Sequence, residues 1–346
     1  MKKTSCIVCY LPSEREEWRG FVPKLSEDQV KWHFYCDKQR GLLERYYGRL
    51  SVFRTCLELV RSAKQLQADL IITYNPRLSF WCIFFSTLLG VQTKHIAYSF
   101  NYHELPHGVK RRLQKWAFTN INQFIVHSKL EKQLYSDYFG IPTERIEVRL
   151  WCMAVPKVQP EKPLETGDYI CALGGNARDY QTLMTAMRKL PDIQMIIVVR
   201  PSNLKNLSIP PNVKVMVNID EAHAMNILKY SRFMVLPLKG SEVPCGHVTL
   251  VAAMHLGKAF VITNSSGVSD YVFHNYNGVT CEPFAPDALA EAIRTLWNDA
   301  ARCQQLGKNG RQFAEEHCSE ELGPKHLQHL LFRENLLMQY ELGKAG

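Results

Sequence analysis

Short apolar runs alternate with segments of helical apolar spacing along the first half of the chain. Residues 4–10 and 69–74 are continuous apolar runs bounded by polar or turn residues, a pattern that favours buried strands. Residues 49–66 repeat apolar side chains every three or four positions, which predicts a helix. By the same criteria we expect strands at 94–100, 123–126 and 145–150, and helices at 80–89, 109–119 and 129–139.

The second half repeats this alternation after a break at residues 154–167, where three prolines and no apolar period predict a linker. We expect strands at 169–173, 194–199, 213–217, 233–236 and 259–263. We expect helices at 179–190, 221–230, 248–256, 285–297 and 302–318, and a final helix at 327–342.

Strands that alternate with helices predict an α/β protein with parallel sheets covered on both faces. The linker separates two such series, so we expect two Rossmann-like domains that face a cleft. The first domain covers residues 1–153 and the second covers residues 168–326. Ligands are expected in the cleft, at the carboxyl ends of the strands of both domains.

Composition restricts the class of protein. The 346 residues are 46% hydrophobic and 22% charged, which is ordinary for a globular protein of about two domains. The 11 cysteines are scattered and odd in number, a pattern typical of reduced core residues and not of a disulfide framework. We see no signal peptide, and the most apolar helix, 80–89, is about half of the ~20 residues needed to cross a bilayer. A cytoplasmic location follows from these features.

The net charge of +9 favours an anionic partner, such as a nucleotide diphosphate or a phospholipid surface. No nucleic-acid-binding motif accompanies this charge, so we do not expect a nucleic-acid partner. Metal-ligand spacing is also absent, and we expect no metal site. A basic surface without a specific partner is the alternative.

The stretch 232–272 is the most informative part of the chain. It has the order strand, polar loop, helix and strand, which is typical of a parallel βαβ unit. The helix begins near Gly246 and is followed by Gly257 at a C-cap position. Backbone N–H groups at such a helix start bind anions, and Thr249 adds a hydroxyl. Alternatively, Thr249 is an ordinary first-turn residue.

A second glycine-containing loop follows the first strand of the second half. Gly174 and Gly175 let a backbone approach an anion, and Arg178 could hold a phosphate with both arms of its guanidinium. Arg200 ends the next strand and lies at the same edge of the expected sheet. The alternatives are a glycine turn with a surface arginine and a solvated arginine at a strand end.

Five segments of the second half resemble the donor-binding domain of the GT-B glycosyltransferases, and glycosyltransferase family 4 in particular. They are 245–249 (CGHVT), 253–258 (AMHLGK), 261–263 (VIT), 267–271 (GVSDY) and 277–278 (NG). The resemblance implies a nucleotide-sugar donor whose diphosphate lies over the helix that starts near Gly246. It also implies that the first domain binds the acceptor and that the final helix packs back on it.

The resemblance assigns residues to the site. Binding of the donor is expected from Gly174, Gly175, Asn176, Arg178, Arg200, Cys245, Gly246, His247, Val248 and Thr249. Catalysis is expected from Glu242, His103 and Asn101. Glu242 matches the first of two family glutamates with a spacing two residues longer than usual, and it could instead be a solvated loop acid. His103 and Asn101 follow the third strand of the first domain, near the expected sugar, although His103 could be an exposed loop residue.

The second family glutamate, which binds the ribose, is replaced by Ala252. Glu282 could compensate, or donor binding could be weak or lost. The helix at 109–118 carries a basic face and Trp116, which is compatible either with peripheral contact to an anionic membrane or with an ordinary solvated face.

The resemblance therefore implies a retaining, metal-independent glycosyltransferase that uses a nucleotide-diphosphate sugar as donor substrate and needs no cofactor. The acceptor would be a glycan, a lipid-linked molecule or a small molecule. One alternative is a catalytically inactive GT-B protein that acts as a partner or regulatory subunit. A sugar-nucleotide epimerase is a further alternative, which the absence of paired cleft carboxylates makes weaker.

Overall fold

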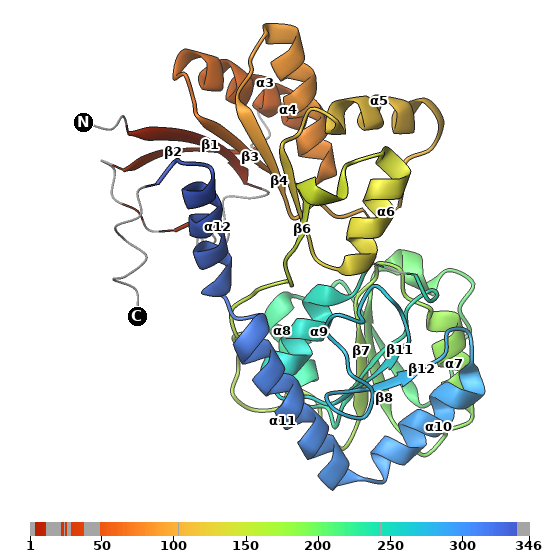
Figure 1. Ribbon diagram of the computed structural model, residues 1–346. Coiled ribbons are helices and arrows are strands. Elements are labelled where there is room, and N and C mark those ends of the chain that lie inside the picture. Colours follow the sequence, from red (N-terminus) through yellow and green to blue (C-terminus); the bar gives the residue numbers. More distant parts are fainter. Residues whose placement is uncertain are drawn as a thin grey trace. The chain divides into compact units, whose positions relative to one another are not determined.

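Each half of the chain is organised around one parallel sheet (Figure 1). The structure, a computed structural model, describes residues 4–11, 22–23, 25, 29–37, 49–102, 104–242 and 244–337. It divides into unit 1, Met1–Arg149 with Glu320–Gly346, and unit 2, Leu150–Ser319.

Among the described residues, the sheet of unit 1 has six strands in the order β2-β1-β3-β4-β5-β6, and all pairs are parallel. Its strands are β1 (Ser5–Leu11), β2 (Val30–Cys36), β3 (Leu70–Tyr74), β4 (Lys94–Tyr98), β5 (Gln123–Val126) and β6 (Ile146–Val148). Its helices are α3 (Arg49–Gln65), α4 (Pro76–Leu89), α5 (Gly108–Phe118), α6 (Lys129–Phe139) and α12 (Leu322–Arg333), with a 3-10 turn η1 (Thr143–Arg145).

Successive residues of β1 point to opposite faces of this sheet, and both faces are buried. Ile7 and Cys9 pack in a cluster with Leu327 and Leu331 of α12, whereas Val8 packs in a second cluster with α3 and α4. A third cluster contains residues of α5 and α6. Burial on both faces explains why the strands appear in the sequence as continuous apolar runs.

Unit 2 has the same architecture. Within the described residues its six strands have the order β12-β11-β10-β7-β8-β9, again all parallel. The strands are β7 (Ile170–Leu173), β8 (Met195–Val199), β9 (Val213–Val217), β10 (Met234–Leu236), β11 (Phe260–Thr263) and β12 (Val279–Cys281). The helices are α7 (Tyr180–Arg188), α8 (Glu221–Tyr230), α9 (His247–His255), α10 (Pro286–Trp297) and α11 (Ala300–His317), with a 3-10 turn η2 (Pro201–Leu204).

Two helix layers cover this second sheet. Side chains of α7 and α10 form a core cluster with one face, and side chains of α8, α9 and α11 form a cluster with the other (Figure 1). Strand β7 lies between β8 and β10. After β7 the chain continues toward one edge of the sheet, to β8 and β9, and after β10 it continues toward the opposite edge, to β11 and β12. Such a reversal opens a crevice at the carboxyl ends of the two strands, where ligands of doubly wound sheets bind. The loops that begin at Gly174 and at Pro237 meet there.

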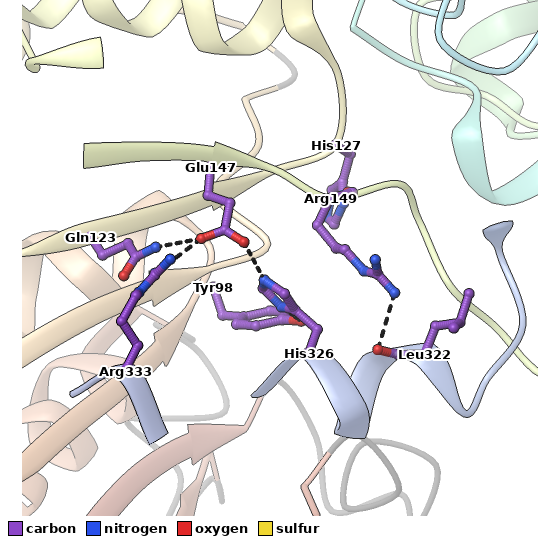
Figure 2. Close-up of polar contacts among 8 residues, drawn as sticks. All are labelled: Tyr98, Gln123, His127, Glu147, Arg149, Leu322, His326 and Arg333. Carbon is purple, nitrogen blue, oxygen red and sulfur yellow. Dashed lines mark hydrogen bonds and ion pairs between the residues drawn. The ribbon is translucent and has the colours of Figure 1, made fainter. Parts of the chain in front are cut away.

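A polar cluster fastens α12 to the sheet of unit 1 (Figure 2). The Glu147 carboxylate of β6 accepts hydrogen bonds from His326 Nε2 at 2.6 Å, Arg333 Nη2 at 3.0 Å and Gln123 Nε2 at 2.7 Å. The bond from His326 is the main cause that lowers the pKa of Glu147 from its usual 4.5 to about 2. Segments far apart in sequence are thereby joined within one unit.

The two-domain α/β fold and its parallel sheets are confirmed, and most predicted elements lie within a few residues of their expected bounds. Three predictions need correction. Strands β2 and β12 were not predicted, because β2 is half exposed and β12 has only three residues. The final helix spans Leu322–Arg333 and not 327–342, because Glu334 follows as its C-cap; residues 338–342 lie outside the described residues. The predicted linker, 154–167, contains no helix or strand and clusters with unit 2.

None of the helices in the described part of the chain combines the length and the apolar character that a bilayer span requires.

Candidate functional site

The loop after β7 brings a buried arginine to the carboxyl edge of the sheet of unit 2. Gly174 has φ +105° and Ala177 has φ +50°, so the loop turns twice through left-handed backbone conformations. Asp179 caps α7 by accepting a hydrogen bond from Thr182 N at 3.0 Å. The helix therefore begins at Tyr180, and Arg178 lies in the loop before it.

The side chain of Arg178 is buried at this edge of the sheet, with only 5% of the residue exposed. Its guanidinium donates to Asn176 O at 2.8 Å and Leu173 O at 3.4 Å, and Nη2 lies 3.5 Å from Thr249 Oγ1. Among the described residues it forms no ion pair with a carboxylate. Burial lowers the pKa of Arg178, because removal from water disfavours its charged form. A buried positive charge of this kind favours an anionic ligand.

The first turn of α9 lies next to the same guanidinium. Gly246 is the N-cap, with φ +103° and no side chain to satisfy the first N–H groups of the helix. A Cβ at Gly246 would lie 3.3 Å from the Leu236 side chain, 3.4 Å from that of Leu238 and 3.7 Å from Arg178 Nη1. Glycine is therefore required both by the backbone conformation and by space. The positive end of the helix dipole and the guanidinium both favour an anion at this place, the anion site that the sequence predicts.

The His247 side chain takes part in the packing of α9. The His247 side chain is buried, its Nε2 lies 2.8 Å from Gly267 O, and its ring packs 5.0 Å from the ring of Tyr271. This imidazole belongs to the packing of the helix, so only the backbone of His247 faces the anion site. Cys245 is likewise buried, whereas Val248 is exposed.

Arg200 lies at the rim of this site. It is exposed, and its Nη1 donates to Asn176 Oδ1 at 2.8 Å. Asn203, which the sequence analysis did not identify, donates from Nδ2 to Gly175 O at 2.9 Å, and its Oδ1 would be 2.7 Å from a Cβ at Gly175. A side chain at Gly175 would therefore force Asn203 to move, an effect visible only in three dimensions.

The loop after β10 places Glu242 in solvent at the same edge of the sheet. Lys239 N donates to Ala177 O at 3.1 Å, and Ser266 N donates to Ser241 O at 2.7 Å. These bonds attach both the start and the middle of the loop to neighbouring segments, and Glu242 is exposed beside them. The Glu242 carboxylate is therefore hydrated in the free protein, and the fold does not pay a desolvation cost to hold it there.

Ala252 packs in the apolar core of unit 2, with 1% of the residue exposed. Glu282, the possible substitute for a ribose-binding glutamate, is exposed at the end of β12 and accepts from Asn264 Nδ2 at 3.0 Å. The structure thus places a carboxylate near the strand ends, but directly after β12 and not on α9, where Ala252 lies.

The carboxyl edge of unit 1 contains a buried carboxylate that the sequence analysis missed. Glu131 is fully buried and accepts from His127 N at 2.9 Å, Ser128 Oγ at 3.1 Å and Tyr135 Oη at 3.3 Å, as well as from the side-chain amide of Asn101. The sequence signal was the spacing Ser-x-x-Glu, since Ser128 caps α6 and Glu131 is its third residue.

Asn101 is thus held by Glu131, at the edge where catalytic residues were expected. His103 lies outside the described residues, so its predicted role stays a prediction. In the described part of the chain, no group of three or more His, Cys, Asp and Glu side chains has the arrangement of a metal site.

Helix α5 has an apolar stripe that faces solvent. Val109, Leu113 and Trp116 follow one another at helical spacing and are 69%, 50% and 42% exposed. Arg111 packs over Tyr138 of α6 at 4.1 Å and donates to its carbonyl oxygen. The helix therefore presents apolar and basic side chains together.

Comparison with known proteins is consistent with this geometry. Residues 175–313, which lie in unit 2, match the family model described as Glycosyl transferases group 1. No curated protein sequence matches the chain.

Solved structures are similar over nearly the whole chain. A glycosyltransferase from Rickettsia africae aligns with a TM-score of 0.72 at 13% identity and covers 96% of this chain and 99% of its own. HepE of Anabaena, in complex with UDP-glucose, aligns with a TM-score of 0.72 at 14% identity, covering 95% and 99%. Sucrose-phosphate synthase of Thermosynechococcus elongatus gives 0.71 at 15% identity, covering 95% and 98%. The two-sheet architecture is therefore the GT-B fold of glycosyltransferases.

Proposed function

We propose that this GT-B protein transfers a sugar from a nucleotide-diphosphate sugar to a glycan, a lipid-linked molecule or a small-molecule acceptor. The observation that carries the proposal is the buried Arg178 guanidinium, which has no carboxylate partner among the described residues and lies at the first turn of α9. A diphosphate would supply the negative charge that Arg178 lacks, and its oxygen atoms would accept hydrogen bonds from the guanidinium.

In the proposed reaction the bond between the sugar and the diphosphate breaks, and negative charge grows on the departing diphosphate. Arg178 and the N–H groups at the start of α9 stabilise that charge in a site largely withdrawn from water. Glu242 binds hydroxyl groups of the sugar. The resemblance to family 4 makes retention of the anomeric configuration the expected outcome.

The comparisons favour a uridine nucleotide as the first donor to test. HepE of Anabaena was solved in complexes with UDP and with UDP-glucose. At 14% identity it is similar in fold, so the choice of UDP for this chain is part of our proposal.

Titration calorimetry with UDP tests the proposed site. We expect Arg178→Met to weaken UDP binding about 10- to 100-fold, because charge-assisted hydrogen bonds contribute roughly 1.5–3 kcal/mol. Arg188→Met is the matched control, since Arg188 lies in the same unit and donates only to Ser208 O at 2.7 Å. Equal affinity of Arg178→Met and the control would exclude this site.

A second candidate function, an inactive partner or regulatory subunit, is favoured by Ala252. The apolar packing of this residue removes a charge-assisted contact to the ribose, worth roughly 1.5–3 kcal/mol. An assay that detects release of free nucleotide from a panel of nucleotide sugars distinguishes the active transferase from the inactive protein. UDP binding without any release or transfer would favour the inactive protein.

We also propose that α5 contacts an anionic membrane from the cytoplasmic side, where the 11 free cysteines would stay reduced. The exposed stripe of Val109, Leu113 and Trp116 would enter the interface, and the basic residues of the helix would pair with lipid phosphates. Sedimentation with vesicles tests this contact. Trp116→Ser should reduce binding to phosphatidylserine vesicles, and equal binding of wild type to neutral and anionic vesicles would contradict it.

A further inference from the structure

All three residues of β6 line one pocket of unit 1. The pocket has a volume of about 830 Å³, which lies within the range of roughly 300–1,000 Å³ that is usual for small-molecule sites. Its other walls come from the start of β5 and from α6, η1 and α12. Every lining residue belongs to unit 1, so the pocket shares no residue with the anion site at Arg178.

Cationic side chains predominate on the walls of this pocket. Four of its ten lining residues are basic, Lys129, Lys132, Arg145 and Arg333, and two are acidic. Lys132 and Arg145 form no ion pair among the described residues, and the Arg145 guanidinium donates to the uncharged Thr119 O at 3.0 Å. Lys132 is partly exposed and Arg145 is exposed, so both charges are accessible to a ligand. The pocket therefore favours an anion.

The two carboxylates of the pocket offset this positive charge only in part. Glu147 already accepts hydrogen bonds from His326 and Arg333, as Figure 2 shows. Among the described residues, the Arg333 guanidinium donates only from Nη2, at 3.0 Å to Glu147, so most of its five N–H groups remain for a ligand. The second carboxylate, Glu144, is exposed and hydrated.

Two side-chain amides add neutral hydrogen-bonding groups. Asn122 Oδ1 accepts from His95 N at 2.8 Å, which leaves the amide nitrogen of Asn122 to donate. Gln123 Nε2 donates to Glu147 at 2.7 Å, which leaves the carbonyl oxygen of Gln123 to accept. The pocket thus offers one amide donor and one amide acceptor, a combination that suits hydroxyl groups.

The outer edge of β6 adds a backbone donor. Among the described residues β6 is the last strand of its sheet, next to β5. Arg149 N donates to Val126 O of β5 at 2.8 Å, and in a parallel ladder the residues that bond to one neighbour alternate along the strand. The N–H of Val148, which lines the pocket, therefore points away from β5. Such N–H groups at the edge of a sheet contribute to anion sites.

We propose that this pocket binds a small molecule that carries two phosphate groups and several hydroxyl groups, as a sugar bisphosphate does. Guanidinium groups bind phosphate through paired hydrogen bonds, and lysines bind it as point charges. The basic residues come from three elements, α6, η1 and α12, so two phosphate groups reach more of them than one. The amides of Asn122 and Gln123 bind the hydroxyl groups. The ligand thereby links α12 to η1 and α6 within unit 1.

Titration calorimetry of the full chain with fructose 1,6-bisphosphate as the probe tests the pocket. Saturating UDP is present to occupy the proposed donor site, and the titration is repeated in Arg178→Met so that the result does not depend on UDP. The wild type should bind the bisphosphate at least about 10-fold more tightly than inorganic phosphate, because two charged groups contact separate walls.

A pair of matched double variants locates the binding. Lys132→Met with Arg145→Met should weaken binding of the bisphosphate at least about 10-fold, because both unpaired cations are lost. Lys110→Met with Arg112→Met removes the same charges from exposed positions of α5 and should leave the affinity unchanged. Equal affinity of the two double variants would overturn the inference.

A measurement on the wild type needs no variant. The bisphosphate should slow amide hydrogen exchange in α12, which carries Arg333, and should not change exchange in α8 of unit 2. Unchanged exchange in α12 would overturn the inference. Equal affinity for the bisphosphate and for inorganic phosphate would also overturn it, since the pocket would then hold single anions only. No binding by the wild type would mean that the cations only protect the edge of the sheet from pairing with other chains.

Discussion

The carboxyl edges of the two sheets bury opposite charges. Unit 2 buries a guanidinium, Arg178, whose partners are two carbonyl oxygens and a hydroxyl. Unit 1 buries a carboxylate, Glu131, that accepts hydrogen bonds from the backbone of His127 and from three side chains. Both edges belong to six-stranded parallel sheets, but the two charged residues lie in different elements, Arg178 in the loop after β7 and Glu131 in the first turn of α6.

This difference distinguishes a buried charge that we propose binds a ligand from one whose partners all lie within the protein. Glu131 already has the donors that a buried carboxylate requires, so a ligand would gain little from it. Arg178 lacks an opposite charge among the described residues, so its desolvation is compensated only when an anion binds. The same sheet architecture thus has, at one edge, a buried positive charge without a carboxylate partner among the described residues and, at the other, a buried carboxylate whose hydrogen bonds are satisfied within the protein.

The largest expected effect concerns ligand-dependent stability. UDP at a concentration of 100 Kd should raise the free energy of unfolding of the wild type by about 2.7 kcal/mol. Arg178→Met should lose most of this increase while its stability without ligand changes by less than about 1 kcal/mol, because removal of a buried charge offsets the loss of its hydrogen bonds. Urea unfolding with and without UDP measures both values. Strong destabilisation without ligand would make Arg178 a structural residue like Glu131.

The opposite result is expected for the buried carboxylate. Glu131→Gln should lower the free energy of unfolding by about 2 kcal/mol, because an amide group faces donors that need an acceptor. Its Kd for UDP should equal that of the wild type. Urea unfolding and calorimetry check the two parts. If Glu131→Gln had the stability of the wild type but bound UDP more weakly, Glu131 would be a ligand-binding residue and not a structural one.

A half-exposed carboxylate, Glu147, provides an intermediate case. Because its folded-state pKa is depressed to about 2, its contribution to stability is present above pH 4.5 and is lost as the pH falls toward 2. Glu147→Gln should be less stable than wild type by about 1 kcal/mol at pH 7, and the difference should disappear near pH 2. Urea titrations across this range test it. A difference that stays constant with pH would mean that the bonds to His326 and Arg333 do not depend on the charge of Glu147.

The smallest effect is expected at the hydroxyl beside Arg178. Thr249→Val should weaken UDP binding about 2- to 10-fold, since a single hydrogen bond contributes about 0.5–1.5 kcal/mol. Thr185→Val is a suitable control, because Thr185 is partly exposed on α7 and, among the described residues, donates to Gln181 O at 3.0 Å. Equal losses in both variants would remove Thr249 from the site.

The loops at the carboxyl edge of unit 2 could be predicted from the sequence because their signals are local. Gly246 at a helix start and Gly174 after a strand are positions where turn chemistry alone predicts glycine. The burial of Arg178 was not predictable, since it depends on pairing of its loop with Leu238 after β10, 60 residues later. The burial of the His247 side chain likewise depends on contact with Tyr271, which lies in a separate loop.

The edge of unit 1 was harder to predict. The capping spacing of Ser128 and Glu131 is visible in the sequence, but the other donors to Glu131 come from a separate strand end and a later turn of α6. The pairing of Ser99 with His127 also spans two strands, so no local pattern indicates it. Local conformation could therefore be predicted from the sequence, whereas the partners of buried polar groups could be identified only from the three-dimensional structure.

The central claim is that the start of α9 and the guanidinium of Arg178 hold a diphosphate. A crystal structure of the chain with UDP tests it most directly. We predict diphosphate oxygens within hydrogen-bonding distance of the Arg178 guanidinium and of backbone N–H groups in the first turn of α9. A diphosphate bound elsewhere, with Arg178 still bonded only to Asn176 O, Leu173 O and Thr249, would contradict the account.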